Sequence, residues 1–171
     1  MNTASYNVKD DDVPTIEMDK EGVLMRKALG VCKTVDDFEA FLKNYPKPMG
    51  VEANFGVIDA LGNGAYFETN NSTYTRFDLK DAPDGVLIRT NYSFTGREGE
   101  GKGYIRYENA QHLLAKHIEA CDITPAVLTE EVSRSYYHSL LQVDYGTLNM
   151  PWVVDQGFIP RRTSTATIEI E

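Results

Sequence analysis

The sequence predicts an α/β protein in the broad sense (α+β), in which helices flank an antiparallel sheet. Between residues 53 and 91, apolar and polar side chains alternate with the period of two that is typical of strands. The regions on either side show the apolar period of amphipathic helices instead. We find no internal repeat and no interdomain linker. We therefore expect one domain spanning residues 1–171.

The region before the sheet is predicted to form two helices in a hairpin. The first covers MDKEGVLMRKALGVC (Met18 to Cys32), and the second covers the residues after Thr34, whose hydroxyl can cap a helix. Asp36 and Asp37 would lie in the first turn of the second helix, where the helix dipole favours anions. The apolar residues of the first helix fall on adjoining faces, at Val23, Leu24, Ala28, Leu29 and Cys32. The buried stripe expected for the second helix is Val35, Phe38, Phe41 and Leu42.

Four strands are predicted in the central region, with antiparallel pairing. A Gly-Asn-Gly turn joins the first two strands, and Ala82-Pro83-Asp84-Gly85 separates the last two. The last strand would end at the polar pair Thr90 and Asn91. The expected strands are Ala53 to Asp59, Ala65 to Thr69, Tyr74 to Leu79 and Val86 to Thr90.

A glycine-rich loop and two further helices are predicted after Asn91. The loop REGEGKG (Arg97 to Gly103) lacks the residues of a P-loop or a Rossmann motif, and we expect a mobile rim over a pocket. A helix from Tyr104 to Cys121 would carry Arg106 in its first turn. A second helix would begin near Thr124 or Thr129 and extend to Gln142.

Composition and charge exclude several classes of function. The net charge is −9 and the pI is near 4.8, which argues against nucleic acid and against an anionic membrane surface as partners. No apolar segment reaches the roughly 20 residues that a membrane-spanning helix needs, and the N-terminus does not have the pattern of an export signal. Cys32 and Cys121 make no redox motif, so their disulfide state stays open.

The central segments resemble, in order and spacing, the N-terminal-nucleophile (Ntn) hydrolases of the choloylglycine hydrolase and penicillin acyltransferase kind. The pieces are ANFGVIDALGNGAYFETN, GVLIRTNYSFTG and GKGYIRYENAQHLL. The similarity covers most of the chain, including GFIPRRTSTATIEIE near its end. It implies part of a four-layer αββα sandwich with two antiparallel sheets. The positions that match the family pattern are Asp59, Gly62, Glu68, Thr90, Asn91, Arg106 and Tyr107.

The resemblance also implies a site. Asn91 would stabilise the oxyanion of amide hydrolysis through its carboxamide, and Arg106 would organise the nucleophile. Asn2 is the first choice for completing the oxyanion hole, and Asn7 is the second. Tyr92, Phe94 and Tyr104 flank the glycine-rich loop and would line an acyl pocket. Each residue also has a purely structural interpretation. Asn91 would cap a turn, and Arg106 would be a solvated side chain. The aromatic rings would pack in the core, above all Phe94.

The implied reaction is hydrolysis or acyl transfer at a linear, non-peptide C–N amide bond through a thioester. The family's nucleophile is a processed N-terminal cysteine that has no counterpart here, so we expect a fragment that lacks this cysteine and also strands beyond Glu171. The expected partner is a small N-acyl amide substrate, and no metal or organic cofactor is implied. Hydrolase and acyltransferase activity are not distinguished, and the compartment is not predicted.

Two alternatives stay open. In the first, the chain serves as a noncatalytic binding module that forms homo-oligomers through open sheet edges. Alternatively, Thr3 or Ser5 would replace the nucleophile. A metal site at His117 and Cys121 is disfavoured because further ligands are absent from the pattern, and His112 and His138 have no nucleophile partner in the sequence.

Overall fold

The computed structural model describes residues 1–5, 7–8 and 19–161. The chain divides into two compact units, Met1–Gly101 and Lys102–Glu171. Most of the segment GFIPRRTSTATIEIE, from residue 162 on, lies outside the described residues.

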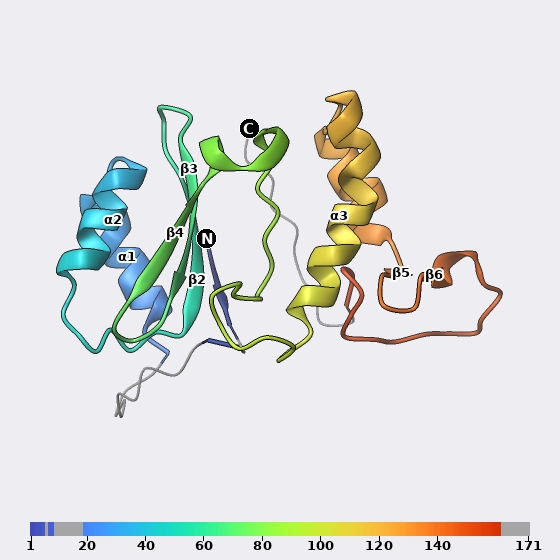
Figure 1. The fold of residues 1–171 in the computed structure, drawn as a ribbon, viewed down its shortest axis with the longest axis horizontal. Helices are drawn as coiled ribbons and strands as arrows, with labels where there is room; N and C mark the ends of the chain where they lie inside the picture. Colours follow the sequence, from blue (N-terminus) through green and yellow to red (C-terminus); the bar gives the residue numbers. More distant parts are fainter. Residues whose placement is uncertain (6, 9–18, 162–171) are drawn as a thin grey trace. The chain divides into compact units, whose positions relative to one another are not determined.

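The first unit contains a four-stranded sheet in the order β1-β2-β3-β4 (Figure 1). All three pairings are antiparallel, and β2 and β3 pair from Ala53↔Thr69 to Ile58↔Gly64. The antiparallel hairpin of β2 and β3 confirms the sequence prediction, as does the strand β4. The bounds are β1 Asn2–Ala4, β2 Ala53–Ile58, β3 Gly64–Thr69 and β4 Tyr74–Asp78.

The turn between β2 and β3 is built around one carboxylate. Asp59 accepts backbone hydrogen bonds from Leu61 and Asn63 through Oδ1, at 2.9 and 3.1 Å. Gly62 has φ +84°, a left-handed conformation that glycine adopts without strain. Asp59 Oδ2 also accepts from the Val35 amide at 3.1 Å, at the start of α2. One side chain therefore joins the hairpin turn to a helix N-terminus.

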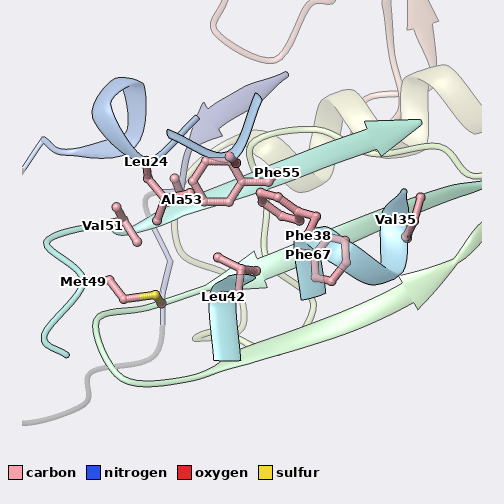
Figure 2. Packing of buried hydrophobic residues seen from close by; sticks show 11 residues of the cluster. Leu24, Val35, Phe38, Leu42, Met49, Val51, Ala53, Phe55 and Phe67 are labelled. Carbon is pink, nitrogen blue, oxygen red and sulfur yellow. The ribbon is translucent and has the colours of Figure 1, made fainter. Parts of the chain in front are cut away.

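Two helices, α1 (Glu21–Val31) and α2 (Val35–Asn44), cover one face of this sheet (Figure 1). The predicted cap is confirmed: Thr34 and Asp37 form a capping box, with Asp37 N donating to Thr34 Oγ1 at 3.0 Å. Figure 2 shows how Phe38 packs among the strand residues Phe55 and Phe67. The core between helices and sheet consists of Leu24, Ala28, Val35, Phe38, Leu42, Met49, Val51, Ala53, Phe55, Ala65 and Phe67.

Two of the apolar positions predicted for the first helix are not in the core. Leu29 is 81% exposed and Val23 is 51% exposed, whereas Leu24 is fully buried. The helix begins at Glu21 and rests on the sheet along the narrow stripe of Leu24 and Ala28. The apolar pattern in this helix is wider than the face that the sheet covers.

The predicted strand from Val86 to Thr90 is wrong. This segment has no strand ladder in the described part of the chain, although Val86 at its start is extended. The Thr90 carbonyl accepts a hydrogen bond from the Tyr66 hydroxyl instead, at 2.7 Å. In Figure 1 the segment runs on the side of the sheet away from α1 and α2.

The second unit begins with the helix α3 (Gly103–Ala120), close to the predicted bounds. The following helix is much shorter than predicted: helical turns at Val127–Glu131 and Val132–Arg134 end well before Gln142. The chain then forms the two-stranded pair β5 (Tyr137–His138) and β6 (Val143–Asp144). The chain is already extended at Ser135, and the amide of Ser139, within the predicted helix, donates to Asn109 Oδ1 on α3 at 2.7 Å. The coarse fold class, helices with antiparallel sheets, is confirmed.

Candidate functional site

The outer face of the first sheet is polar. Because side chains alternate along a strand, Phe55 and Phe67 face the helices while Asn54, Tyr66 and Glu68 face the other way. Asn54 is fully buried and Glu68 is 3% exposed. Polar side chains at such positions need hydrogen-bond partners, because a buried polar group without one lowers the free energy of unfolding by about 1–3 kcal/mol.

The partners come from the segment of residues 89–97, which contains Asn91. Glu68 Oε1 accepts from the Phe94 amide at 2.8 Å. Glu68 Oε2 accepts from both the Thr95 amide and the Thr95 hydroxyl, at 2.8 and 2.7 Å. This carboxylate therefore receives three hydrogen bonds from two consecutive residues, Phe94 and Thr95. They offset the cost of burying its charge.

A second buried side chain, Asn7, holds the same segment. Its Nδ2 donates to the carbonyls of Ser93 and Arg97, at 2.8 and 3.0 Å, and its Oδ1 accepts from the Ser93 amide at 2.9 Å. Ser5 Oγ donates to the same Oδ1 at 3.1 Å. Four hydrogen bonds use the full capacity of a carboxamide. In this arrangement the Asn7 carboxamide has no donor left for an oxyanion.

The approach of the Asn7 backbone explains one glycine. A Cβ at Gly96 would lie 1.9 Å from the Asn7 carbonyl oxygen, far inside any possible contact. The Arg97 amide donates to that same carbonyl at 2.7 Å. Arg97 Nη1 also donates to the Val8 carbonyl at 2.5 Å. The glycine-rich loop that was predicted to be a mobile rim is thus anchored at its first residue.

Arg89 fixes the other end of the segment. Its guanidinium carbon lies 4.8 Å from the ring centroid of Phe77 and 4.9 Å from that of Phe94. The Tyr66 ring lies 5.6 Å away. Such cation–π contacts favour a guanidinium that is partly removed from water. Burial raises the pKa of the Tyr66 phenol, which keeps it protonated as a donor to Thr90.

Asn91 therefore lies in a segment that is fixed on both sides. Thr90 before it accepts from Tyr66, and Ser93 after it is bonded through both its amide and its carbonyl. Asn91 itself is half-buried. Asn2, the other predicted oxyanion residue, lies in β1, where its backbone pairs with Phe55. The segment supplies the kind of preorganised support that an oxyanion donor needs.

The predicted pocket aromatics fall in both units. Tyr92 and Phe94 meet edge to face, with ring centroids 5.5 Å apart. Phe94 is 43% exposed, so the interpretation of this ring as core is wrong. Tyr104 belongs to α3 in the second unit and is half-buried.

Arg106 is buried in the second unit, where its Nη1 donates to the Gln156 carbonyl. Asn109, one turn later on α3, donates to the Gly157 carbonyl at 2.7 Å. The interpretation of Arg106 as a solvated helix-start residue is therefore wrong. In the structure, Arg106 and Asn109 together bind the backbone of residues 156–157 to α3.

No side chain of the described residues has the features of an activated nucleophile. Burial, and then the nearby Asp37 carboxylate, raise the pKa of the Cys32 thiol, which disfavours the reactive thiolate. Cys121 is exposed at the left-handed end of α3. Ser5, an alternative nucleophile, is buried and hydrogen-bonded to Ser93 Oγ at 2.8 Å, without a base. Thr3 is half-buried on β1.

The histidines take structural positions. His117 Nδ1 lies 2.6 Å from Asp122 Oδ1, and its Nε2 lies 3.3 Å from Glu131 Oε2. Both contacts raise the pKa of His117, and the hydrogen bond to Asp122 contributes most. His112 stacks on Tyr137, with the two ring centroids 4.0 Å apart. His138 is buried, with Nε2 3.7 Å from Asp155 Oδ1. Over the described residues, no group of three or more His, Cys, Asp or Glu side chains could hold a metal ion.

Two of the hollows in the first unit differ in character. The polar one, of about 220 Å³, adjoins the Asn91 segment and is lined by Glu68, Ser93 and Thr95 among others. The other, of about 240 Å³, is mainly apolar and lies between α1 and β2, with Cys32 and Phe38 in its wall. The polar hollow is the one that shares residues with the anchored segment.

Comparisons of the chain with protein-family models, with curated proteins and with solved structures found no match. Among the helices that the structure describes, none is long and apolar enough to cross a membrane. The geometry of the Asn91 segment is therefore the main physical basis for a functional hypothesis, together with the resemblance noted in the sequence. The roles of Glu68 and Asn7 in holding that segment were not predicted, although the pattern Tyr66-x-Glu68 on a buried strand was a visible signal.

Proposed function

We propose that this chain supplies the oxyanion-stabilising part of a cysteine-nucleophile amidase or acyltransferase that acts on linear, non-peptide C–N amide bonds. One observation supports the proposal above others: Asn91 lies in an irregular segment that buried side chains fix on both sides. This proposal includes the finer architecture, a four-layer αββα sandwich, of which the sheet with α1 and α2 would be two layers. The attacking cysteine has no counterpart in the described residues and would come from sequence outside the chain.

In the proposed reaction, the cysteine thiolate attacks the amide carbonyl and its S–C bond forms. The carbonyl oxygen becomes an oxyanion, to which the Asn91 carboxamide donates a hydrogen bond worth about 3 kcal/mol in the transition state. The C–N bond then breaks, and the amine leaves with a proton. Water or another acceptor attacks the thioester, giving the acid or the transferred acyl product and restoring the thiol.

Arg106 has a supporting role in this proposal. It would organise the nucleophile, and within the second unit its guanidinium donates to the Gln156 carbonyl. Tyr92 and Phe94 would line the acyl pocket, since the exposed Phe94 ring is available to an apolar substrate. Tyr104 and Asn2 keep their proposed places in the pocket and the oxyanion hole.

The test joins the chain to the sequence encoded immediately upstream and incubates the product with a panel of N-acyl amides and hydroxylamine. Hydroxylamine converts a thioester into a hydroxamate that mass spectrometry detects. We expect hydroxamate formation, and we expect Asn91→Ala to lower kcat by about 100-fold or more. Asn44→Ala, at the exposed end of α2, is the matched control. Wild-type turnover by Asn91→Ala, or no hydroxamate from any amide, would contradict the proposal.

A second candidate function is a noncatalytic binding module that associates with copies of itself. The observation that favours it is the set of exposed apolar side chains in the second unit: Leu140, Leu141, Met150, Trp152 and Val154 are between 48% and 74% exposed. Large exposed apolar groups mark interaction surfaces. Sedimentation of the 171-residue chain distinguishes the two: a concentration-dependent dimer without turnover favours the module, and a monomer excludes self-association.

A further inference from the structure

We propose that Glu68 is a positioning residue for Asn91, and this inference rests on the proposed amidase function. Glu68 and Tyr66 are two residues apart on β3 and therefore face the same side of the sheet. Tyr66 holds Thr90, immediately before Asn91, and Glu68 holds Phe94 and Thr95, just after it. One strand thus anchors the backbone on both sides of the proposed oxyanion donor.

The chemistry of the site requires a carboxylate at position 68. Three donors point at its two oxygens, from the Phe94 amide, the Thr95 amide and the Thr95 hydroxyl. A glutamine has almost the same shape, but its amide nitrogen is a donor and would face another donor. A buried carboxylate with fewer donors would be costly, so the three bonds and the segment's conformation depend on each other.

The position also explains why a carboxylate is kept on a buried strand. The neighbours of Glu68 on β2 and β4 are Asn54 and Thr75, so this part of the outer face is polar from strand to strand. In the described part of the chain, residues 93–95 belong to no strand ladder, and the Phe94 and Thr95 amides donate to Glu68. Glu68 thus holds the backbone three and four residues after Asn91.

The test compares Glu68→Gln with Glu98→Gln, the same chemical change at an exposed glutamate of the neighbouring loop. The first measurement uses NMR on the ¹⁵N-labelled 171-residue chain, with the Asn91 carboxamide signal assigned through Asn91→Asp. In Glu68→Gln we expect the Phe94 and Thr95 amides to exchange with solvent about tenfold faster or more. We also expect the Asn91 carboxamide signal to shift or broaden. Glu98→Gln should leave both unchanged.

The second measurement uses the form of the protein that turns over an N-acyl amide. We expect Glu68→Gln to lower kcat about tenfold or more while KM stays within about twofold, because an interaction made only in the transition state is lost. Thr95→Val removes one of the three bonds and keeps the carboxylate. It serves as a milder variant if Glu68→Gln fails to fold, with the same effects at smaller size.

The outcomes separate this inference from the amidase proposal. Unchanged amide exchange and an unmoved Asn91 signal would overturn the positioning role, whatever the enzyme does. Loosened amides with an unchanged kcat would overturn it as well, because Glu68 would then be only a structural anchor. If the NMR effects appear and no form of the protein cleaves any amide, the control of Asn91 by Glu68 is supported and the amidase proposal fails.

Discussion

The sharpest test of the first unit compares two leucines of α1. Leu24 is fully buried against the sheet, whereas Leu29, five residues later on the same helix, is 81% exposed. Replacing each by alanine removes the same atoms and changes helix propensity equally, so burial is the main difference. Buried Leu→Ala substitutions cost about 3–5 kcal/mol in free energy of unfolding. Exposed substitutions stay within about 0.5 kcal/mol.

The assay is urea unfolding followed by circular dichroism, with hydrogen exchange resolved by peptide. Trp152 is the only tryptophan and lies 74% exposed in the second unit, so its fluorescence is a poor reporter of the first. With a slope of about 2 kcal/mol/M, Leu24→Ala should lower the midpoint of the first unit by about 1.5 M or more. Leu29→Ala should leave it nearly unchanged. Equal losses, or a larger loss for Leu29→Ala, would refute the packing of α1.

Three further predictions concern single hydrogen-bonded groups. Thr34→Ala should lower the free energy of unfolding by about 1 kcal/mol, measured by urea unfolding, because the helix cap is lost; a neutral result would contradict the capping box. The hydrogen bond to Asp122 is the main cause that raises the pKa of His117. The protonated His117 therefore stabilises the second unit fully below the usual histidine pKa of about 6.5, and this stabilisation is lost as the pH rises through the raised pKa. The free energy of unfolding of His117→Asn, measured against pH, should lack this dependence. Tyr66→Phe should lower the free energy of unfolding by about 1 kcal/mol, because the hydrogen bond to Thr90 is lost. In an absorbance titration of the wild type, Tyr66 should ionise above the usual range of tyrosine pKa values. The absence of both effects would contradict the buried phenol.

The sequence predicted those elements that local rules determine. Alternation and a Gly-Asn-Gly turn located β2 and β3, and the Thr34 cap located the start of α2, because both signals lie within a few residues of the structure they specify. The segment Val86 to Thr90 also alternates, but its carbonyl partner is the side chain of Tyr66, more than 20 residues away. Likewise, Ser139, which lies within the predicted helix after Thr124, donates its amide to Asn109 on α3. Side-chain contacts of this range leave no local pattern.

The candidate site shows the same division. Asn91 was identified through the resemblance, as the end of a predicted strand, and it does lie in a fixed segment, although the described structure has no strand there. The residues that fix it, Asn7 and Glu68, lie 84 and 23 positions away in the sequence. Their buried polar groups would be unfavourable in isolation, and only the folded sheet shows which donors they meet.

The two faces of β3 connect stability with the placement of Asn91. Phe67 packs in the core with Phe38, and its neighbours Tyr66 and Glu68 anchor the Asn91 segment on the opposite face. Because packed strands move as units, a shift of β3 toward a cavity in the core would displace both anchors together. The polar outer face does not make the fold more stable than an apolar face would, because its hydrogen bonds mainly offset the cost of desolvation. What it does provide is one conformation for an irregular segment, which a site built on a single asparagine requires.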